Sequence, residues 1–180
     1  MGRKAFIVID MQGVSFTALT PRFDTEGVVK RINLLSSYFR KQDAPVIFIQ
    51  HDGTKEGGCI PGTEEWKLLP ELEVEPTDLV ISKMANDAFY RSDLPNQLSR
   101  MDVKELVITG CATDFCVEAT VQSALVKDYS VTVVRDGHTT ADRPSLKAID
   151  VIDHYNWVWE NMTPTNGAIQ VLTTEQILHT

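Results

Sequence analysis

The sequence predicts an α/β fold of three layers (α/β/α), in which helices cover both faces of a six-stranded, mostly parallel, Rossmann-like sheet. Two observations predict it. Short β-branched apolar runs alternate along the chain with longer stretches of helical periodicity, as in parallel sheets whose strands are joined by helices. Most of these runs are apolar throughout, which is typical of strands buried on both faces. A length of 180 residues suits a single domain over 1–180.

Each of the six predicted strands is a short apolar run. The runs are Ala5–Ile9, Pro45–Gln50, Asp78–Ile81, Glu105–Thr109, Ser130–Val134 and Ala168–Leu172. Open parallel sheets bind their ligands beyond the carboxyl ends of the strands. The polar residues that directly follow these runs are therefore the first candidates for a functional site.

The predicted helices are segments in which apolar residues recur at helical spacing. The first follows Thr25, a predicted N-cap, and the others cover Phe115–Lys127, Ser145–Tyr155 and a short stretch near Glu175. The segment Asp52–Pro76 is rich in Gly and Pro and fits this rhythm poorly. We expect it to be a long functional loop, with one helical turn around Glu64–Leu69.

Charge and composition exclude several classes of protein. The chain has 17 Lys and Arg against 25 Asp and Glu, a net charge of −8, so its field repels nucleic acid. Its longest apolar runs are far shorter than the roughly 18 residues of a membrane span, and we expect no membrane partner. The first residues predict a strand and not a signal peptide. Three cysteines, an odd number, favour a reducing compartment, hence the cytoplasm.

Three residues that follow predicted strands carry reactive groups: Asp10, Lys83 and Cys116. Taken singly, they are also compatible with a turn cap, a solvated lysine and a small buried side chain. Cys116, however, follows a strand and a short turn and falls in the first turn of a predicted helix, where free backbone N–H groups stabilise a thiolate. We therefore expect its thiolate to titrate well below the free-thiol value of about 8.5. Cys59 and Cys111 do not open a helix after a strand and are predicted to be non-catalytic.

Three segments together resemble one known family. Phe6–Gln12, Val80–Lys83 and Ile108–Val117 resemble the isochorismatase-like cysteine hydrolases, a superfamily that includes nicotinamidases and N-carbamoylsarcosine amidase. The order and spacing agree from Asp10 to His138, so the resemblance covers nearly the whole chain. The segment around the cysteine is long and specific, whereas the other two are weak without it. The fold that the resemblance implies is the isochorismatase-like hydrolase fold.

The resemblance also implies a catalytic triad of Asp10, Lys83 and Cys116. Asp10 would take the thiol proton, and the Lys83 ammonium group would hold the carboxylate and the thiolate together. Backbone N–H groups of Ala112 and Cys116 would form the oxyanion hole, with a cis peptide bond before Ala112 as in the family. The implied reaction is hydrolysis of an amide or related C–N bond of a small molecule through a cysteine thioester.

Five further residues are expected to bind the substrate. Gln12 lies in the first of the three family segments, and His51 is expected to be a hydrogen-bonding pocket residue or simply a strand-end histidine. Phe16, Trp66 and Phe89 fall in loops that line the pocket in relatives, where their rings would enclose a small planar substrate. The alternative for each of these aromatic residues is packing in the core.

A metal site is not expected. Nicotinamidases bind a metal through one Asp and several His in the loop after the second strand, and this chain has only His51 there. No other cofactor is expected either, because no Gly-x-Gly-x-x-Gly segment follows a strand. His138 could line the same edge of the sheet or have a structural role.

Two other functions and the oligomeric state stay open at this point. An isochorismatase-type vinyl-ether hydrolase shares the fold but typically lacks the cysteine at the position of Cys116. A non-enzymatic member that binds a small molecule or a partner protein should have lost triad residues. Relatives form dimers or tetramers, and the aromatic-rich run His154–Trp159 would suit an interface, so we expect a homo-dimer or homo-tetramer.

Overall fold

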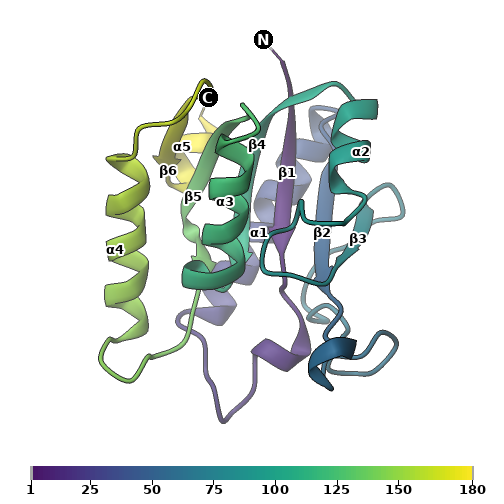
Figure 1. Cartoon of the computed structure of the whole chain (residues 1–180), viewed down its shortest axis with the longest axis vertical. Helices are drawn as coiled ribbons and strands as arrows, with labels where there is room; N and C mark the ends of the chain where they lie inside the picture. The colour runs from purple at the N-terminus through teal and green to yellow at the C-terminus, as the bar shows by residue number, and fades with distance from the viewer. Residues whose placement is uncertain (1, 180) are drawn as a thin grey trace.

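The computed structural model describes residues 2–179, and its centre is a six-stranded sheet in which every strand pairing is parallel. The strands lie in the order β3–β2–β1–β4–β5–β6 (Figure 1). Their bounds are β1 Arg3–Ile9, β2 Val46–His51, β3 Leu79–Lys83, β4 Val103–Cys111, β5 Ser130–Thr139 and β6 Ile169–Leu172. The central strands β1 and β4 therefore have sheet on both sides, and their carboxyl ends meet in the middle of one edge.

Helices cover both faces of this sheet, which confirms the predicted α/β/α layers. On one face lie α1 (Thr25–Lys41) and α5 (Thr174–Leu178); on the other lie α2 (Leu94–Arg100), α3 (Glu118–Leu125) and α4 (Ala148–Glu160) (Figure 1). Three short turns complete the elements: η1 (Gly13–Ser15), η2 (Thr54–Glu56) and the π-helical η3 (Thr113–Val117). None of the helices within residues 2–179 has the length and apolar character needed to cross a membrane.

The side chains of the central strands point alternately into two apolar cores. In β1, Ile7 and Ile9 belong to the core under α2, α3 and α4, where Trp159 is fully buried. Phe6 and Val8 belong to the core under α1, and the Phe6 ring stacks on Phe39 of that helix with centroids 5.2 Å apart. Because both faces are covered, successive positions of a strand must be apolar, which explains the continuous apolar runs of the sequence.

All six predicted strands are present, but β4 and β5 are longer than predicted. The pairing of the two strands shifts in register after Ile108, so that Gly110 pairs with His138 and β5 continues to Thr139. His138, which lies beyond the end of the predicted strand, is thus inside β5. The reason is the irregular register, which no local pattern reveals.

The predicted helices are also present, with three differences. α2 is absent from the sequence prediction, because its seven residues bury only Leu94 and Leu98 and show no sustained periodicity. Thr25 is the first residue of α1 and not its N-cap, and its hydroxyl donates a hydrogen bond to the Arg22 carbonyl oxygen. The helical turn expected around 64–69 is a series of non-helical turns, and the loop's short helix is η2 instead.

Candidate active site

The three predicted catalytic residues lie together at the carboxyl edge of the sheet. Asp10 follows β1, Lys83 ends β3, and Cys116 lies in η3, directly after β4. Lys83 Nζ is 2.6 Å from Asp10 Oδ2 and 3.3 Å from Cys116 Sγ. One ammonium group therefore contacts both the carboxylate and the sulfur.

The backbone at this edge is shaped by the close approach of β1 and β4. Gly110 has a φ of 121°, and a Cβ there would lie 2.1 Å from the carbonyl oxygen of Ile9, so this position cannot hold a side chain. Asp10, the next residue after Ile9, adopts a left-handed φ of 47°, a conformation in which Asp is enriched. The peptide bond Cys111–Ala112 is cis, as the resemblance implies. Cys116 then sits in a π-helical turn, a feature that is frequent at functional sites.

Lys83 is fully buried, and its ammonium group has a partner for each of its three donors. Besides Asp10 and Cys116, it contacts the carbonyl oxygen of Ala85 at 2.9 Å. Burial lowers the pKa of Lys83, but the contacts with the Asp10 carboxylate and the Cys116 sulfur raise it by more, so the net shift is upward. The lysine is therefore a fixed positive charge at the centre of the site.

Asp10 uses one carboxylate oxygen for Lys83 and leaves the other without a partner. Its Oδ1 is buried and has no hydrogen bond to any of the described residues. Burial raises the pKa of Asp10 above its ordinary 3.8, although Lys83 and the Cys116 thiol lower it. A carboxylate with a raised pKa and an unused oxygen is suited to accept a proton.

The low pKa expected for Cys116 is wrong. Burial and the Asp10 carboxylate raise the pKa of this thiol, and Lys83 lowers it by less. The physical reason is the charge balance, because a thiolate added to the neutral Asp10–Lys83 pair would be an uncompensated buried charge. Cys116 is thus a thiol until a base takes its proton. Burial also raises the pKa of Cys111, to about 12, so that this cysteine is inert.

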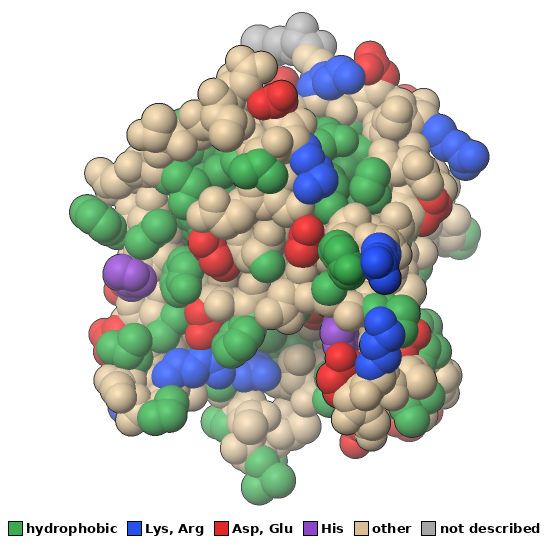
Figure 2. Space-filling view, viewed as in Figure 1, with side chains coloured by type: hydrophobic (Ala, Val, Ile, Leu, Met, Phe, Trp, Pro, Cys, Tyr) green, Lys and Arg blue, Asp and Glu red, His purple; other side chains and the backbone are tan. Residues whose placement is uncertain are grey.

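A cavity of about 240 Å³ opens beside Cys116 at this edge. In Figure 2 the surface is hollowed near the carboxyl ends of the strands, with Lys or Arg side chains on one side and a His on the other. The cavity contains both predicted oxyanion-hole residues in its wall. Its lining residues are Asp10, Gln12, Val14, Ser15, Arg22, His51, Asn86, Cys111, Ala112, Phe115, Cys116 and Arg143.

Two of the five predicted substrate-binding residues, His51 and Gln12, line this cavity. His51 ends β2, and its Nδ1 is buried without a hydrogen bond to the described residues. The Gln12 amide is instead used within the protein. Its Nε2 donates to the carbonyl oxygens of His51 (3.1 Å) and Trp66 (2.7 Å), and its Oε1 accepts a bond from the His51 N–H (2.7 Å). Gln12 therefore holds the wall of the pocket together.

The three predicted aromatic residues do not line this cavity. Phe16 faces a different cavity, beside α1, and packs against the core on that face. Trp66 contributes its carbonyl oxygen to the Gln12 contact, and its ring does not reach the cavity wall. Phe89 is buried in the core with its ring centroid 5.6 Å from that of Tyr129, because burial of a large apolar ring is favourable. From the same segment it is Asn86 that reaches the cavity, with Oδ1 3.6 Å from the Cys116 sulfur.

Two arginines in the cavity wall are not predicted from the sequence. Arg143 donates two hydrogen bonds of 2.7 Å to the Asp114 carboxylate and a third to the Thr140 hydroxyl, so its charge is paired. Arg22 comes from the loop between η1 and α1, and its Nε is buried without a partner among residues 2–179. Neither arginine directly follows a strand, so a search restricted to strand ends overlooks residues that loops bring to the same edge.

His138 has a structural role. Its Nδ1 is 2.9 Å from Thr113 Oγ1 and its Nε2 is 3.1 Å from Asn156 Oδ1. Burial lowers its pKa to about 4, so the ring is neutral at physiological pH. Because Thr113 is the first residue of η3, His138 supports the turn that carries Cys116.

The described residues offer little that could bind a metal. Within residues 2–179, the His, Cys, Asp and Glu side chains do not gather in groups of three or more that could hold an ion. At the end of β2, His51 Nε2 lies 3.7 Å from Glu56 Oε2, and these two groups alone fall short of the three protein ligands typical of a catalytic zinc site.

Comparison with known proteins gives the family. A family model of the isochorismatase domain matches residues 4–176. An uncharacterised isochorismatase family protein of Bacillus subtilis is 32% identical over 97% of this chain and 98% of its own length. A streptothricin hydrolase of Streptomyces noursei is 30% identical over 81% of this chain, which spans 58% of that hydrolase. A ureidoacrylate amidohydrolase of Pseudomonas savastanoi is 26% identical over 75% of this chain and 70% of its own length.

Solved structures agree with the sequence relatives. The crystal structure of an isochorismatase family protein superposes with a TM-score of 0.87 and 28% identity, covering 94% of this chain and 98% of its own. A structure described as an isochorismatase-family hydrolase, from Chromobacterium violaceum, superposes with a TM-score of 0.87 and 26% identity over 98% and 92% of the two chains. The named relatives support the expectation of a hydrolase. By its domain model, its relatives and its fold, the chain belongs to the isochorismatase family.

Proposed function

We propose that the chain is a cysteine hydrolase that cleaves the C–N bond of a small amide through a thioester on Cys116. The observation that carries the proposal is the position of Lys83 Nζ, 2.6 Å from Asp10 Oδ2 and 3.3 Å from Cys116 Sγ, since Asp10 and Cys116 both line the cavity. A thiol beside a carboxylate base and a cation is the arrangement that nucleophilic catalysis requires. The names of two relatives, a streptothricin hydrolase and a ureidoacrylate amidohydrolase, support this reaction class.

In the first step of the proposed reaction, the sulfur of Cys116 attacks the carbonyl carbon of the amide. The thiol proton passes to Asp10, whose buried Oδ1 has no other partner among the described residues. Lys83 remains in contact with the sulfur while negative charge develops on it. The raised thiol pKa fits this order of events, because the proton leaves only as the sulfur attacks.

The carbonyl oxygen then carries the negative charge of a tetrahedral intermediate. Backbone N–H groups of Ala112 and Cys116, which both line the cavity, would stabilise that oxyanion. When the C–N bond breaks, the proton on Asp10 passes to the leaving nitrogen, and ammonia or an amine departs. Water next adds to the thioester and gives a proton to Asp10. Breaking the C–S bond releases the carboxylic acid and returns that proton to the sulfur.

Ammonia or amine release from a panel of small amides and ureido compounds tests the proposal. We expect Cys116→Ala and Cys116→Ser to lower kcat/KM by at least about 10³-fold, because both remove the nucleophile. Their melting temperatures should stay close to that of the wild type, since the Cys116 side chain is only partly buried and lines a cavity. Cys59→Ala is the matched control and should retain activity.

Two outcomes would overturn this function. A Cys116→Ala variant with wild-type turnover would remove the nucleophile from the mechanism. Hydrolysis of a vinyl ether by a wild-type protein that left every amide intact would favour the isochorismatase-type alternative.

We also propose that the reaction needs no metal. Chelator treatment should then leave the activity intact, and His51→Ala should raise KM more than it lowers kcat, because the His51 side chain lines the cavity and pairs with Glu56, at 3.7 Å, and not with any of the three reacting groups. Loss of activity on chelation, with recovery on adding zinc, would contradict this proposal and would favour nicotinamide-like substrates.

A homo-dimer or homo-tetramer in the cytoplasm remains a prediction, which we retain as part of the proposed function. Two observations support it: the side chain of Trp157 is 62% exposed on α4, and all three cysteines are free thiols. An exposed tryptophan is a typical residue of an interface core. Sedimentation at micromolar concentration should give a multiple of 20.1 kDa, and a value of 20.1 kDa would contradict the prediction.

A further inference from the structure

Within residues 2–179, Arg22 is the one arginine, lysine or carboxylate of the cavity wall that has no ion pair. The other charges are matched: Asp10 is paired with Lys83 at 2.6 Å, and Arg143 with Asp114 at 2.7 Å. The Nε of Arg22 is buried and has no hydrogen-bond partner among the described residues. A buried donor without an acceptor is unfavourable unless a ligand supplies that acceptor.

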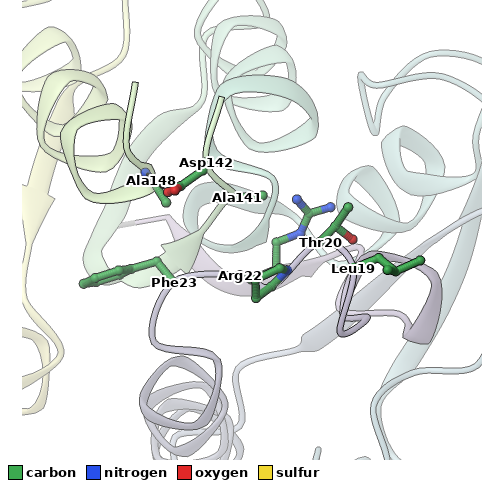
Figure 3. Close-up of a pocket in the computed structure, with 8 residues that line it drawn as sticks. Leu19, Thr20, Arg22, Phe23, Ala141, Asp142 and Ala148 are labelled. Atoms are coloured by element: carbon green, nitrogen blue, oxygen red, sulfur yellow. Dashed lines mark hydrogen bonds between the residues drawn. The ribbon is translucent and has the colours of Figure 1, made fainter. Parts of the chain in front are cut away.

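The backbone holds Arg22 in place. Arg22 pairs with Ala141 in an isolated antiparallel bridge. The next residue, Phe23, donates its N–H to the Thr140 carbonyl oxygen at 3.0 Å and accepts a hydrogen bond of 2.6 Å from the Thr139 hydroxyl. Figure 3 shows the Arg22 side chain rising from this loop beside Ala141. Because the loop is tied to the end of β5, little further ordering of its backbone is needed when a ligand binds.

Arg22 lies in a wall shared by two cavities. One is the cavity that contains Cys116; the other, of about 400 Å³, is drawn in Figure 3 and is lined on its far side by Ala148 of α4. The second cavity also contains Asp142, but that carboxylate is paired with Lys147 at 2.7 Å. The unmatched charge between the two cavities is therefore positive, in a chain whose net charge is −8.

We propose that Arg22 binds a carboxylate group of the substrate, so that the enzyme acts on small amides that also carry an acid group. This rests on the proposed amide hydrolysis at Cys116 and adds the class of substrate. The planar guanidinium group matches a carboxylate in shape and can donate two parallel hydrogen bonds to it. The amide would lie at Cys116 and the acid at Arg22, and the second cavity would leave room for substituents near the acid. A neutral amide would leave the buried Nε of Arg22 without a partner.

The first test does not require hydrolysis. Iodoacetate and iodoacetamide alkylate the same thiol and differ mainly in one negative charge, so the ratio of their rate constants at Cys116 reports a cation in the cavity. We expect Arg22→Gln to lower the rate with iodoacetate about 10-fold and to leave the rate with iodoacetamide nearly unchanged. Arg22→Lys, which keeps the charge, should give an intermediate ratio. Mass spectrometry of the peptide that contains Cys116 measures both rates.

The matched control is Arg100→Gln, which removes the same charge from an exposed position at the end of α2, before β4 and hence at the opposite edge of the sheet. It should leave the ratio of the two rates at its wild-type value. An Arg22→Gln ratio equal to that of the wild type would overturn the proposal.

The second test uses succinamate and its neutral counterpart succinamide, which present the same amide with and without a carboxylate. We expect the wild type to have a kcat/KM for succinamate about 10-fold to 100-fold above that for succinamide, and Arg22→Gln to abolish the difference through a higher KM. Equal kcat/KM values for the two amides in the wild type would overturn the role of Arg22 while the amide hydrolase stands. If the wild type hydrolysed neither succinamate nor succinamide, the proposed amide hydrolysis would fail for these two probes. The ratio of the two alkylation rates would then decide whether Arg22 acts as a cation in the cavity.

Discussion

The Asp10–Lys83 and Asp114–Arg143 ion pairs each contribute one residue to the wall of the same cavity, but only the first leaves a carboxylate oxygen without a partner among the described residues. Both carboxylate oxygens of Asp114 accept hydrogen bonds, two from Arg143 and one from the Thr140 hydroxyl. Burial would raise the pKa of Asp114, but these bonds lower it, so the pair is complete in itself.

The Asp10–Lys83 pair is more deeply buried, and it is incomplete without Cys116. Among residues 2–179, one oxygen of Asp10 has no partner, and one of the three Lys83 contacts is the sulfur. The pKa of Asp10 is raised by burial, whereas that of Asp114 is lowered by its hydrogen bonds. An ion pair between an Asp and a basic side chain thus supports structure where both carboxylate oxygens have partners, and under the proposed function it supports chemistry where one oxygen has none. The four predictions that follow test this difference.

The largest expected difference concerns turnover. Asp10→Asn should lower kcat/KM by about 10²–10⁴-fold, because the amide group cannot accept the thiol proton. Asp114→Asn should change it far less, since Asp114 does not contact the sulfur. Steady-state assays of ammonia release on both variants measure this. Equal losses of kcat/KM in the two variants would contradict the role of Asp10 as the base that accepts the thiol proton.

The next difference concerns stability. Lys83→Met should lower the free energy of unfolding by about 3–5 kcal/mol, because it leaves the buried Asp10 carboxylate without a counter-charge. Urea denaturation of this variant and of Asp10→Asn/Lys83→Met tests the cause. The double variant removes both charges and should recover much of the loss. If it is as unstable as the single variant, lost packing and not the unpaired charge is responsible.

A third prediction separates alkylation of the thiol from turnover. Asp10→Asn removes a negative charge that raises the pKa of Cys116 and keeps Lys83, so the thiol pKa should fall. Iodoacetamide should then label Cys116 faster than in the wild type, by about 3-fold for each unit by which the pKa falls at a pH below that pKa, because the larger thiolate fraction outweighs the lower nucleophilicity of the thiolate. Asp114→Asn is the matched control, with an unchanged rate. Slower labelling in Asp10→Asn would contradict the charge balance that we describe.

The smallest expected effect is a shift in the pH profile. Asp10 must be ionised to accept a proton, and burial raises its folded pKa above 3.8. The value of kcat/KM should therefore fall as the pH drops through this raised pKa, at a pH where an ordinary aspartate is still ionised. A pH–rate profile measures the acid limb, and Asp114→Asn should leave it in place. An acid limb at or below pH 3.8 would exclude Asp10 as the group that titrates.

The sequence predicts the catalytic half of the pocket better than its binding half. Asp10 and Lys83 follow or end strands, and Cys116 follows a strand and a short turn; a parallel sheet brings the ends of its strands to one edge. Their approach to one another is therefore a consequence of strand order. The charge state of Cys116 does not follow from position alone, because it depends on how deeply the neighbouring Asp10–Lys83 pair is buried.

The binding half is built from loops, and its residues carry no local signal. Phe89 and Asn86 belong to the same segment, and whether the ring or the amide faces the cavity depends on how that segment packs on Tyr129 and α3. Arg22 reaches the cavity because its loop bridges to Ala141, more than a hundred positions away in the sequence. A pairing at that distance leaves no periodicity or spacing to detect.

The Gln12 side chain has a consequence for how this enzyme could be redesigned. Its amide nitrogen donates hydrogen bonds to the carbonyl oxygens of His51, at the end of β2, and of Trp66, in the long loop that follows. It also contacts the Cys59 sulfur at 3.5 Å. Residues 60–65, between the contacts at Cys59 and Trp66, are exposed throughout, and the chain turns at Gly62 with a φ of 89°. Loop extension costs little when the ends of the loop are fixed. New recognition segments can therefore be grafted at Gly62, and the reactive edge of the sheet would keep its shape.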